Sequence, residues 1–238
     1  MSAIKERPIL FSAPMVRAIM EGRKTVTRRA VKGFQIPTED KAIPVGDRQR
    51  WSAIGQRDPR YGFCVFGSTE AECAKELEEY APCPYGRRGD RLWVRETFID
   101  LHGTGVEHRA DPDGPLQRYA YAADYRPGSH SDEARKDFGL KHKPSIHMPR
   151  AACRILLEIT DVRVERLKDI SEEQALAEGV RPYPDHAEFG EWYHVEGIET
   201  YSAEPSMSFE LLWSSINGCD SWNANPWVWV VEFKRVTP

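Results

Sequence analysis

Eight consecutive residues, numbers 22–29 with the sequence GRKTVTRR, hold the side chains of this chain that are best suited to chemistry. Lys24 and Thr27 lie three positions apart, Arg28 and Arg29 follow directly, and no acid interrupts the run. A lysine acts as a base only where its surroundings lower its pKa, and a threonine acts as a nucleophile only where a neighbouring base takes its proton. An arginine suits a phosphate or a planar polar edge. The octet therefore predicts a small hydrolytic centre or a nucleic-acid contact. The alternative is purely structural: the octet is then only the end of a helix followed by a solvated edge strand.

The elements around the octet decide whether its side chains can meet. Ser12 can cap a helix that ends at Gly22, and alternating Thr and Val then predict a strand over residues 24–31. On an ideal strand Lys24 and Thr27 would point to opposite faces, about 10 Å apart. They can share a site only if the chain bends just after Gly22 or carries a bulge.

Alternation and periodicity predict further elements along the chain. Expected strands cover residues 8–11, 91–98, 118–123, 152–164 and 227–233, and expected helices cover residues 68–80, 170–179 and 208–216. The second helix has a capping box of Ser171 and Gln174 and a glycine stop at Gly179. Residues 33–82 and 101–143 show little other pattern, which is typical of loop-rich insertions. Because strands and helices do not alternate regularly, we predict an α+β fold, a small mixed β-barrel with flanking helices, and not a doubly wound parallel sheet.

Length and composition favour one elaborated domain without disulfides. The chain has 238 residues, 40% of them hydrophobic, and no apolar run is long enough for a membrane span. Five cysteines are an odd number, and none of them form the closely spaced pairs of a structural zinc site. The first residues lack the apolar stretch of a signal peptide, so we expect a cytoplasmic protein that does not contact membranes.

The net charge of -4 hides an uneven distribution. Residues 1–34 contain eight Lys or Arg and two Glu, a balance of +6, whereas residues 169–210 contain eleven Asp or Glu and one Arg, a balance of -10. A mildly acidic protein can still carry a focused basic cleft. The acidic segment either shields that cleft or is a solvated face.

The octet resembles the signature of the ASCH superfamily, G-x-K-x-x-(E or T)-x-R, whose barrel is related to the PUA RNA-binding fold. Gly22, Lys24, Thr27 and Arg29 satisfy it. Supporting blocks are residues 9–15, 89–97, 171–178 and 225–229, and their layout resembles phage and prophage members. The resemblance covers about half of the chain, omits both insertions and implies a single PUA-like domain over residues 1–238.

One branch of this superfamily is the bacterial N4-acetylcytidine amidohydrolase, which the chain resembles over residues 22–27. The resemblance implies that Lys24, Thr27 and Glu178, the last acid of the capped helix, are catalytic. It implies removal of an acyl group from a modified cytosine nucleoside without a metal or other cofactor. Other members are implicated in RNA binding or cleavage, so an RNA-binding module or ribonuclease is the alternative. That branch is shorter, lacks both insertions and has an apolar residue at the position of Arg28.

Two chemical schemes fit these three residue types. In the first, a neutral Lys24 takes the proton of Thr27, which attacks the acyl carbonyl, and Glu178 orients Lys24 or relays the proton to the leaving amine. In the second, Glu178 activates a water while Lys24 and Thr27 bind the carbonyl. Neither scheme requires a metal.

Four further residues are candidates for binding the substrate. Arg23 and Arg29 flank the octet's catalytic pair, and Arg29 could stabilise an oxyanion. Trp93 and Arg95 share one face of an expected strand and could stack on and pair with a base, although a buried Trp93 beside an ion-paired Arg95 is the simpler interpretation.

The two function classes predict different surfaces. A nucleoside enzyme needs a closed pocket around its three catalytic residues. An RNA-binding module needs an open basic groove that joins the octet's arginines to Arg87 and Arg91.

Overall fold

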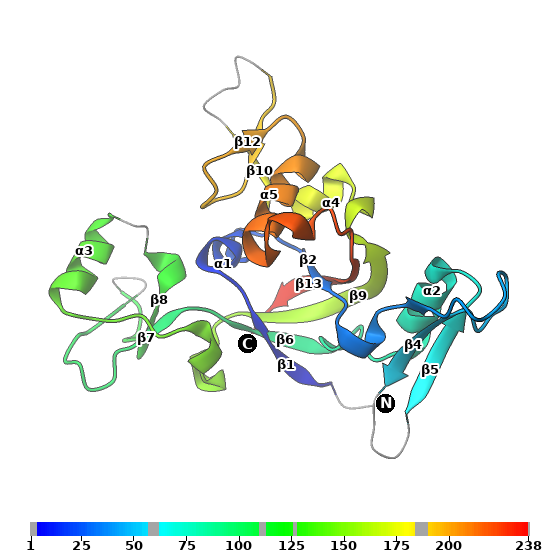
Figure 1. Ribbon diagram of the computed structural model, residues 1–238. Coiled ribbons are helices and arrows are strands. Elements are labelled where there is room, and N and C mark those ends of the chain that lie inside the picture. The colour runs from blue at the N-terminus through cyan, green and yellow to red at the C-terminus, as the bar shows by residue number, and fades with distance from the viewer. Residues whose placement is uncertain (1–3, 57–61, 110–112, 126–127, 184–189, 238) are drawn as a thin grey trace.

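A five-stranded mixed sheet forms the centre of the computed structural model, which describes residues 4–56, 62–109, 113–125, 128–183 and 190–237 (Figure 1). Its strand order is β1-β6-β9-β13-β2. The bounds are β1 Glu6–Leu10, β2 Val26–Ala30, β6 Arg91–Arg95, β9 Leu156–Arg166 and β13 Trp227–Val236. β1 runs parallel to β6, and the other three neighbouring pairs are antiparallel.

The α+β class is therefore confirmed, and the strands expected near residues 24, 91, 152 and 227 lie in one sheet. Within the described ranges no ladder joins β1 to β2, so this sheet is open at both edges and does not form a closed barrel.

β13 lies at the centre of the core because both of its faces are covered. Val228 and Val230 belong to one buried cluster, and Trp229 and Val231 belong to the other. Such a strand has a continuous apolar run and no polar alternation, which explains its sequence WVWVV.

Three helices lie on one side of the central sheet (Figure 1). They are α1 Ala13–Met20, α4 Glu172–Ala177 and α5 Pro205–Asn217. α4 and α5 pack against each other above the sheet, and α1 leads from β1 toward them (Figure 1). Met15 of α1 packs against both core clusters, so this helix joins them. No helix in the described part of the chain is long and apolar enough to cross a membrane.

The segments expected to be loop-rich carry short elements, of which the sequence pattern revealed only one helix and one strand. The first insertion forms β3 Thr38–Glu39, β4 Trp51–Gln56, β5 Phe63–Gly67 and the expected helix, α2 Glu70–Tyr80. The second forms α3 His130–Asp137 and β8 Tyr119–Tyr121, which confirms the strand expected over 118–123 and pairs with β7 Phe98–Asp100 just before the insertion. A third small sheet has β10 Arg181–Pro182, β11 Tyr193–His194 and β12 Tyr201–Ser202. The first two units lie at opposite ends of the central sheet, and the third lies beyond α5 (Figure 1).

Three strand predictions require correction. The strand expected over 152–164 begins only at Leu156, because Arg150–Ala152 form a short 3-10 helix. The strand expected over 24–31 begins only at Val26, because residues 23 and 24 belong to the turn after α1. The strand expected over 91–98 ends at Arg95, and Phe98 starts a new strand that pairs with β8.

Candidate functional site

Lys24 lies in a tight turn between α1 and β2. Gly22 has φ 75°, a left-handed conformation that favours glycine, and the backbone N–H groups of Arg23 and Lys24 both donate to the carbonyl of Ala18. This bend takes Lys24 out of the strand. The spacing of an ideal strand, which would separate Lys24 from Thr27 on opposite faces, therefore does not apply.

The ammonium of Lys24 forms a buried ion pair with Glu178, 154 positions later in the chain. The distance from Nζ to Oε2 is 2.5 Å, and the side chains of Lys24 and Glu178 are 0% and 3% exposed. Lys24 Nζ also donates to the carbonyls of Val26 and Glu178, each at 2.9 Å. An ammonium has three N–H donors, so all three are used and the geometry fits the charged form. Complete burial lowers the pKa of Lys24, and the charge of Glu178 opposes that shift.

The short helix α4 positions Glu178. The predicted capping box is confirmed: the Ser171 hydroxyl accepts from the backbone N–H of Gln174, and the Gln174 side chain accepts from the N–H of Ser171. Glu178 is the C-cap residue, and Gly179 follows with φ 107°. A side chain at Gly179 would also approach Ala18 and Lys24, so the helix stop and the ion pair are closely packed.

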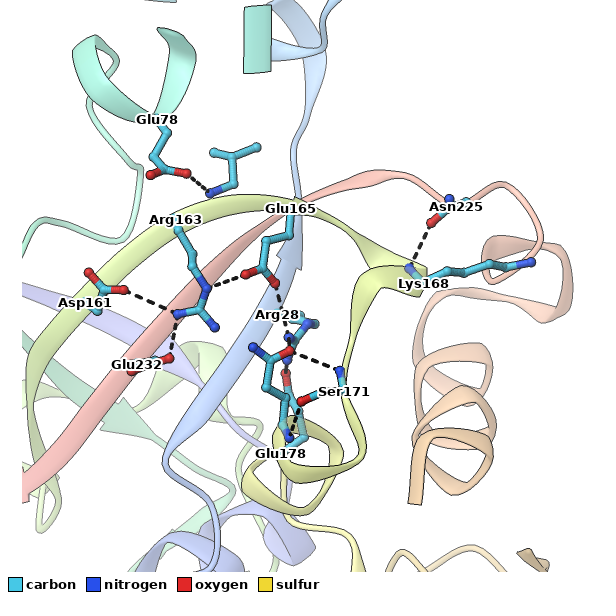
Figure 2. A network of polar contacts seen from close by, with 12 residues as sticks. Arg28, Glu78, Asp161, Arg163, Glu165, Lys168, Ser171, Glu178, Asn225 and Glu232 are labelled. Carbon is cyan, nitrogen blue, oxygen red and sulfur yellow. Dashed lines mark hydrogen bonds and ion pairs between the residues drawn. The ribbon is translucent and has the colours of Figure 1, made fainter. Parts of the chain in front are cut away.

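Arg28 contacts Oε1 of Glu178, whereas Lys24 contacts Oε2. Figure 2 shows Arg28 in a chain of charges that continues through Glu165 and Arg163 to the exposed Asp161. Its guanidinium is 0% exposed and contacts Glu178 Oε1 at 3.4 Å, Glu165 at 3.4 Å and Gln174 Oε1 at 2.5 Å. Glu165 in turn pairs with Arg163. One carboxylate, Glu178, thus lies between two buried cations.

Two cavities meet at Glu178. The Thr27 cavity, of about 120 Å³, is lined by residues of β2 and α5 that include Thr27, Arg28, Arg29, Trp213 and Asn217. The Ala18 cavity, of about 230 Å³, is lined by residues of α1, α5 and the 195–198 segment that include Pro14, Ala18, Val195, Ile198 and Ser215. Both cavities are also lined by Met15, Glu178, Leu212 and Ile216.

Thr27 and Glu178 therefore line one cavity, whereas Lys24 is not among the described residues lining either cavity and lies behind Glu178. Thr27 is only 3% exposed and pairs with Val231 of β13. Among the described residues, no hydrogen bond joins the Thr27 hydroxyl to Lys24 or to Glu178.

Two of the four candidate binding residues lie at these cavities. Arg29 lines the Thr27 cavity, donates to the Leu10 carbonyl at 2.8 Å and lies over the Phe11 ring. Arg23 lines the Ala18 cavity, pairs with Glu21 and donates to the carbonyl of Gly179.

Trp93 and Arg95 are placed elsewhere. Both lie on β6, where the Arg95 guanidinium is 5.3 Å from the Trp93 ring centroid and donates to the Ile146 carbonyl. Neither lines either of the two cavities formed by described residues. The structural interpretation of this pair also needs correction, because Trp93 is only half-buried and the described contacts of Arg95 are with Trp93 and a backbone carbonyl instead of an acid.

Sequence reasoning missed the roles of Arg28 and Gln174. Gln174 was recognisable as a capping residue, but the hydrogen bond that it accepts from Arg28 depends on β2, which lies 146 positions earlier in the chain. The apolar residues Met15, Leu212 and Ile216 were recognisable only as helix faces, and nothing in their spacing distinguishes a cavity wall from a packed core.

Comparison of the chain with protein-family models, with curated proteins and with solved structures finds no match.

Proposed function

We propose that this protein is an amidohydrolase of the ASCH type, with a PUA-like core, that removes the acyl group from an N4-acylated cytosine nucleoside. The observation that carries the proposal is the buried Lys24–Glu178 pair, whose carboxylate lines two cavities while its ammonium is enclosed behind it. A buried ion pair contributes little to stability compared with apolar packing, and ionisable groups with shifted pKa values cluster at functional sites.

The geometry favours Glu178 as the base. Glu178 faces the cavities, and Lys24 has used its three donors to hold the carboxylate and two carbonyls. Glu178 takes a proton from a water, and the resulting hydroxide adds to the acyl carbonyl carbon. Thr27 and Arg29, which line the same cavity, donate hydrogen bonds to the oxyanion.

The reaction then finishes with the proton held by Glu178. This proton moves to N4 of the base as the C–N bond breaks, so the acyl group leaves as a carboxylic acid and the base leaves as an amine. Lys24 is a positioning residue in this scheme, because it holds Glu178 without contacting the substrate.

The alternative of an RNA-binding surface is less well supported by the octet. Arg28 is buried and bonded to three side chains, and Arg23 and Arg29 donate to backbone carbonyls within the fold. These contacts favour a closed site over a basic groove available to a long polyanion.

The experiment incubates the protein with N4-acetylcytidine and analyses the products by mass spectrometry. We expect cytidine and acetate from the wild type, none from Glu178→Gln, and wild-type rates from Glu173→Gln, an exposed acid on the same helix. A wild type that leaves the acylated nucleoside intact but retards RNA on a gel would overturn the enzyme in favour of the binding module.

A further inference from the structure

We propose that the Ala18 cavity binds the acyl group of the substrate, so that the enzyme prefers N4-acyl groups of about four to eight carbons over acetyl. This inference rests on the proposed function and deepens it, because it assigns the part of the substrate that determines specificity.

The walls of the Ala18 cavity are suited to an apolar group. Pro14 and Ala18 of α1, Val195 and Ile198 of the 195–198 segment, and Leu212 of α5 contribute hydrocarbon surface. An apolar cavity of 150 Å³ is enough to bind benzene, so about 230 Å³ exceeds what the methyl of an acetyl group would fill. A small acyl group would leave most of this space without contact.

The charged residues at this cavity are already paired. Arg23 is bound to Glu21 and to the carbonyl of Gly179, and Glu196 is bound to Arg17 at 2.8 Å. The cavity therefore offers little charge of its own to a polar ligand, which favours a hydrocarbon occupant.

The Thr27 cavity has the opposite character and suits the ring of the base. Among the described residues, three buried N–H donors of its lining have no hydrogen-bond partner: Arg28 Nε, Arg29 Nε and Trp213 Nε1. Buried donors normally find acceptors, so these three point to a ligand rich in acceptors. An N4-acylcytosine presents the acceptors O2, N3 and the acyl oxygen.

Glu178 lies where the two cavities adjoin, which is where the bond to be broken must lie. With the ring in the Thr27 cavity and the amide at Glu178, the acyl chain extends into the Ala18 cavity. The shared walls include Met15, whose unbranched side chain adapts to different shapes, and Ile216, which is 55% exposed. Ile216 can move aside at the surface, and Met15 can change its shape while it stays packed between the two core clusters.

The experiment measures kcat/KM for the full chain with acetyl, butanoyl, hexanoyl and octanoyl N4-acylcytidines. Each methylene that enters an apolar cavity should raise kcat/KM about fourfold until the cavity is full. Ser215→Phe should fill the cavity from the exposed side of α5 and flatten this rise. Ser214→Phe places the same ring on the same helix at a residue that lines neither cavity, and should keep the rise.

The outcomes separate this inference from the proposed function. Hydrolysis of acetyl as fast as hexanoyl by the wild type would overturn the acyl cavity and leave the amidohydrolase standing. A rise that persists unchanged in a folded Ser215→Phe variant would also overturn it. Hydrolysis of none of the four compounds would overturn the proposed function itself, and the acyl cavity with it. If Ser215→Phe does not fold, the wild-type series alone decides.

Discussion

Breaking the Lys24–Glu178 pair from either side should destabilise the fold strongly, and the two losses should not add. Lys24→Met leaves the Glu178 carboxylate, which is 3% exposed, with Arg28 at 3.4 Å as its remaining buried cation. The substitution also removes the ammonium that donates to two backbone carbonyls. Glu178→Gln leaves the Lys24 ammonium, which is 0% exposed, without the carboxylate that lies 2.5 Å from it in the wild type. Removing one partner of a buried pair typically costs about 3–5 kcal/mol, so we expect each single variant to lose roughly this much.

The double variant Lys24→Met with Glu178→Gln should lose clearly less than the sum of the two single losses, because it leaves neither charge of the pair behind and Arg28 keeps its contact with Glu165 at 3.4 Å. We expect a coupling energy of at least about 2 kcal/mol in the double-mutant cycle. The carbonyls of Val26 and Glu178 lose their donor in the double variant as well, so it should not recover full stability.

Urea unfolding followed by circular dichroism measures these differences. With a slope of about 3 kcal/mol per molar urea for a chain of this size, each single variant should shift the midpoint down by roughly 1–2 M. A matched control is the exposed pair of Lys234 and Glu158, 2.9 Å apart, whose cycle should give less than about 1 kcal/mol. Single variants of the buried pair with midpoints close to the wild type, or losses that simply add, would refute the reasoning.

Three further predictions concern the substrate, the thiols and the turn. Thr27→Val should lower kcat for N4-acetylcytidine about 10²–10³-fold, because only a hydroxyl at this position can donate to the oxyanion. Thr27→Ser, which retains the hydroxyl, should keep much of the wild-type kcat. An unchanged kcat in Thr27→Val would exclude the Thr27 hydroxyl as an oxyanion donor. Burial raises the pKa of the Cys83 thiol to about 11, so iodoacetamide at pH 8 should alkylate the exposed Cys64 within minutes and Cys83 only after unfolding. The rate of alkylation at Cys83 should climb as the pH approaches 11. Mass spectrometry of the peptides measures both rates, and early labelling of Cys83 at pH 8 would contradict this prediction. Gly22→Ala should cost roughly 1 kcal/mol in thermal or urea unfolding, since φ is 75° but no atom lies within 4 Å of the added Cβ, and a neutral substitution would mean that the turn relaxes freely.

The long elements of the fold were predictable because their apolar patterns are strong. β13 and β9 are ten and eleven residues long, and the box of Ser171 and Gln174 marked the start of α4 correctly. The two-residue strands of the small sheets contain too few positions to show a period of two. The helix α3, with the sequence HSDEARKD, lacks an apolar stripe, so periodicity could not reveal it.

The candidate site was predictable only in part. Lys24 and Glu178 were associated through a family resemblance, and the structure brings their side chains into contact. Periodicity alone would have kept Lys24 in the strand and apart from Thr27. The contacts of Arg28 with Glu165, Gln174 and Glu178 join three separate segments, and no local pattern encodes such a meeting.

A single oxygen atom, Gln174 Oε1, serves two structures at once. It accepts from the backbone N–H of Ser171 at the start of α4, and it accepts from the guanidinium of Arg28 beside the carboxylate of Glu178. α4 has only six residues, too few to be stable on its own in water. Unravelling of this helix and release of the carboxylate are therefore one event rather than two. Slow amide hydrogen exchange along α4 would thus measure how long Glu178 stays in place, and an occupied site should slow that exchange.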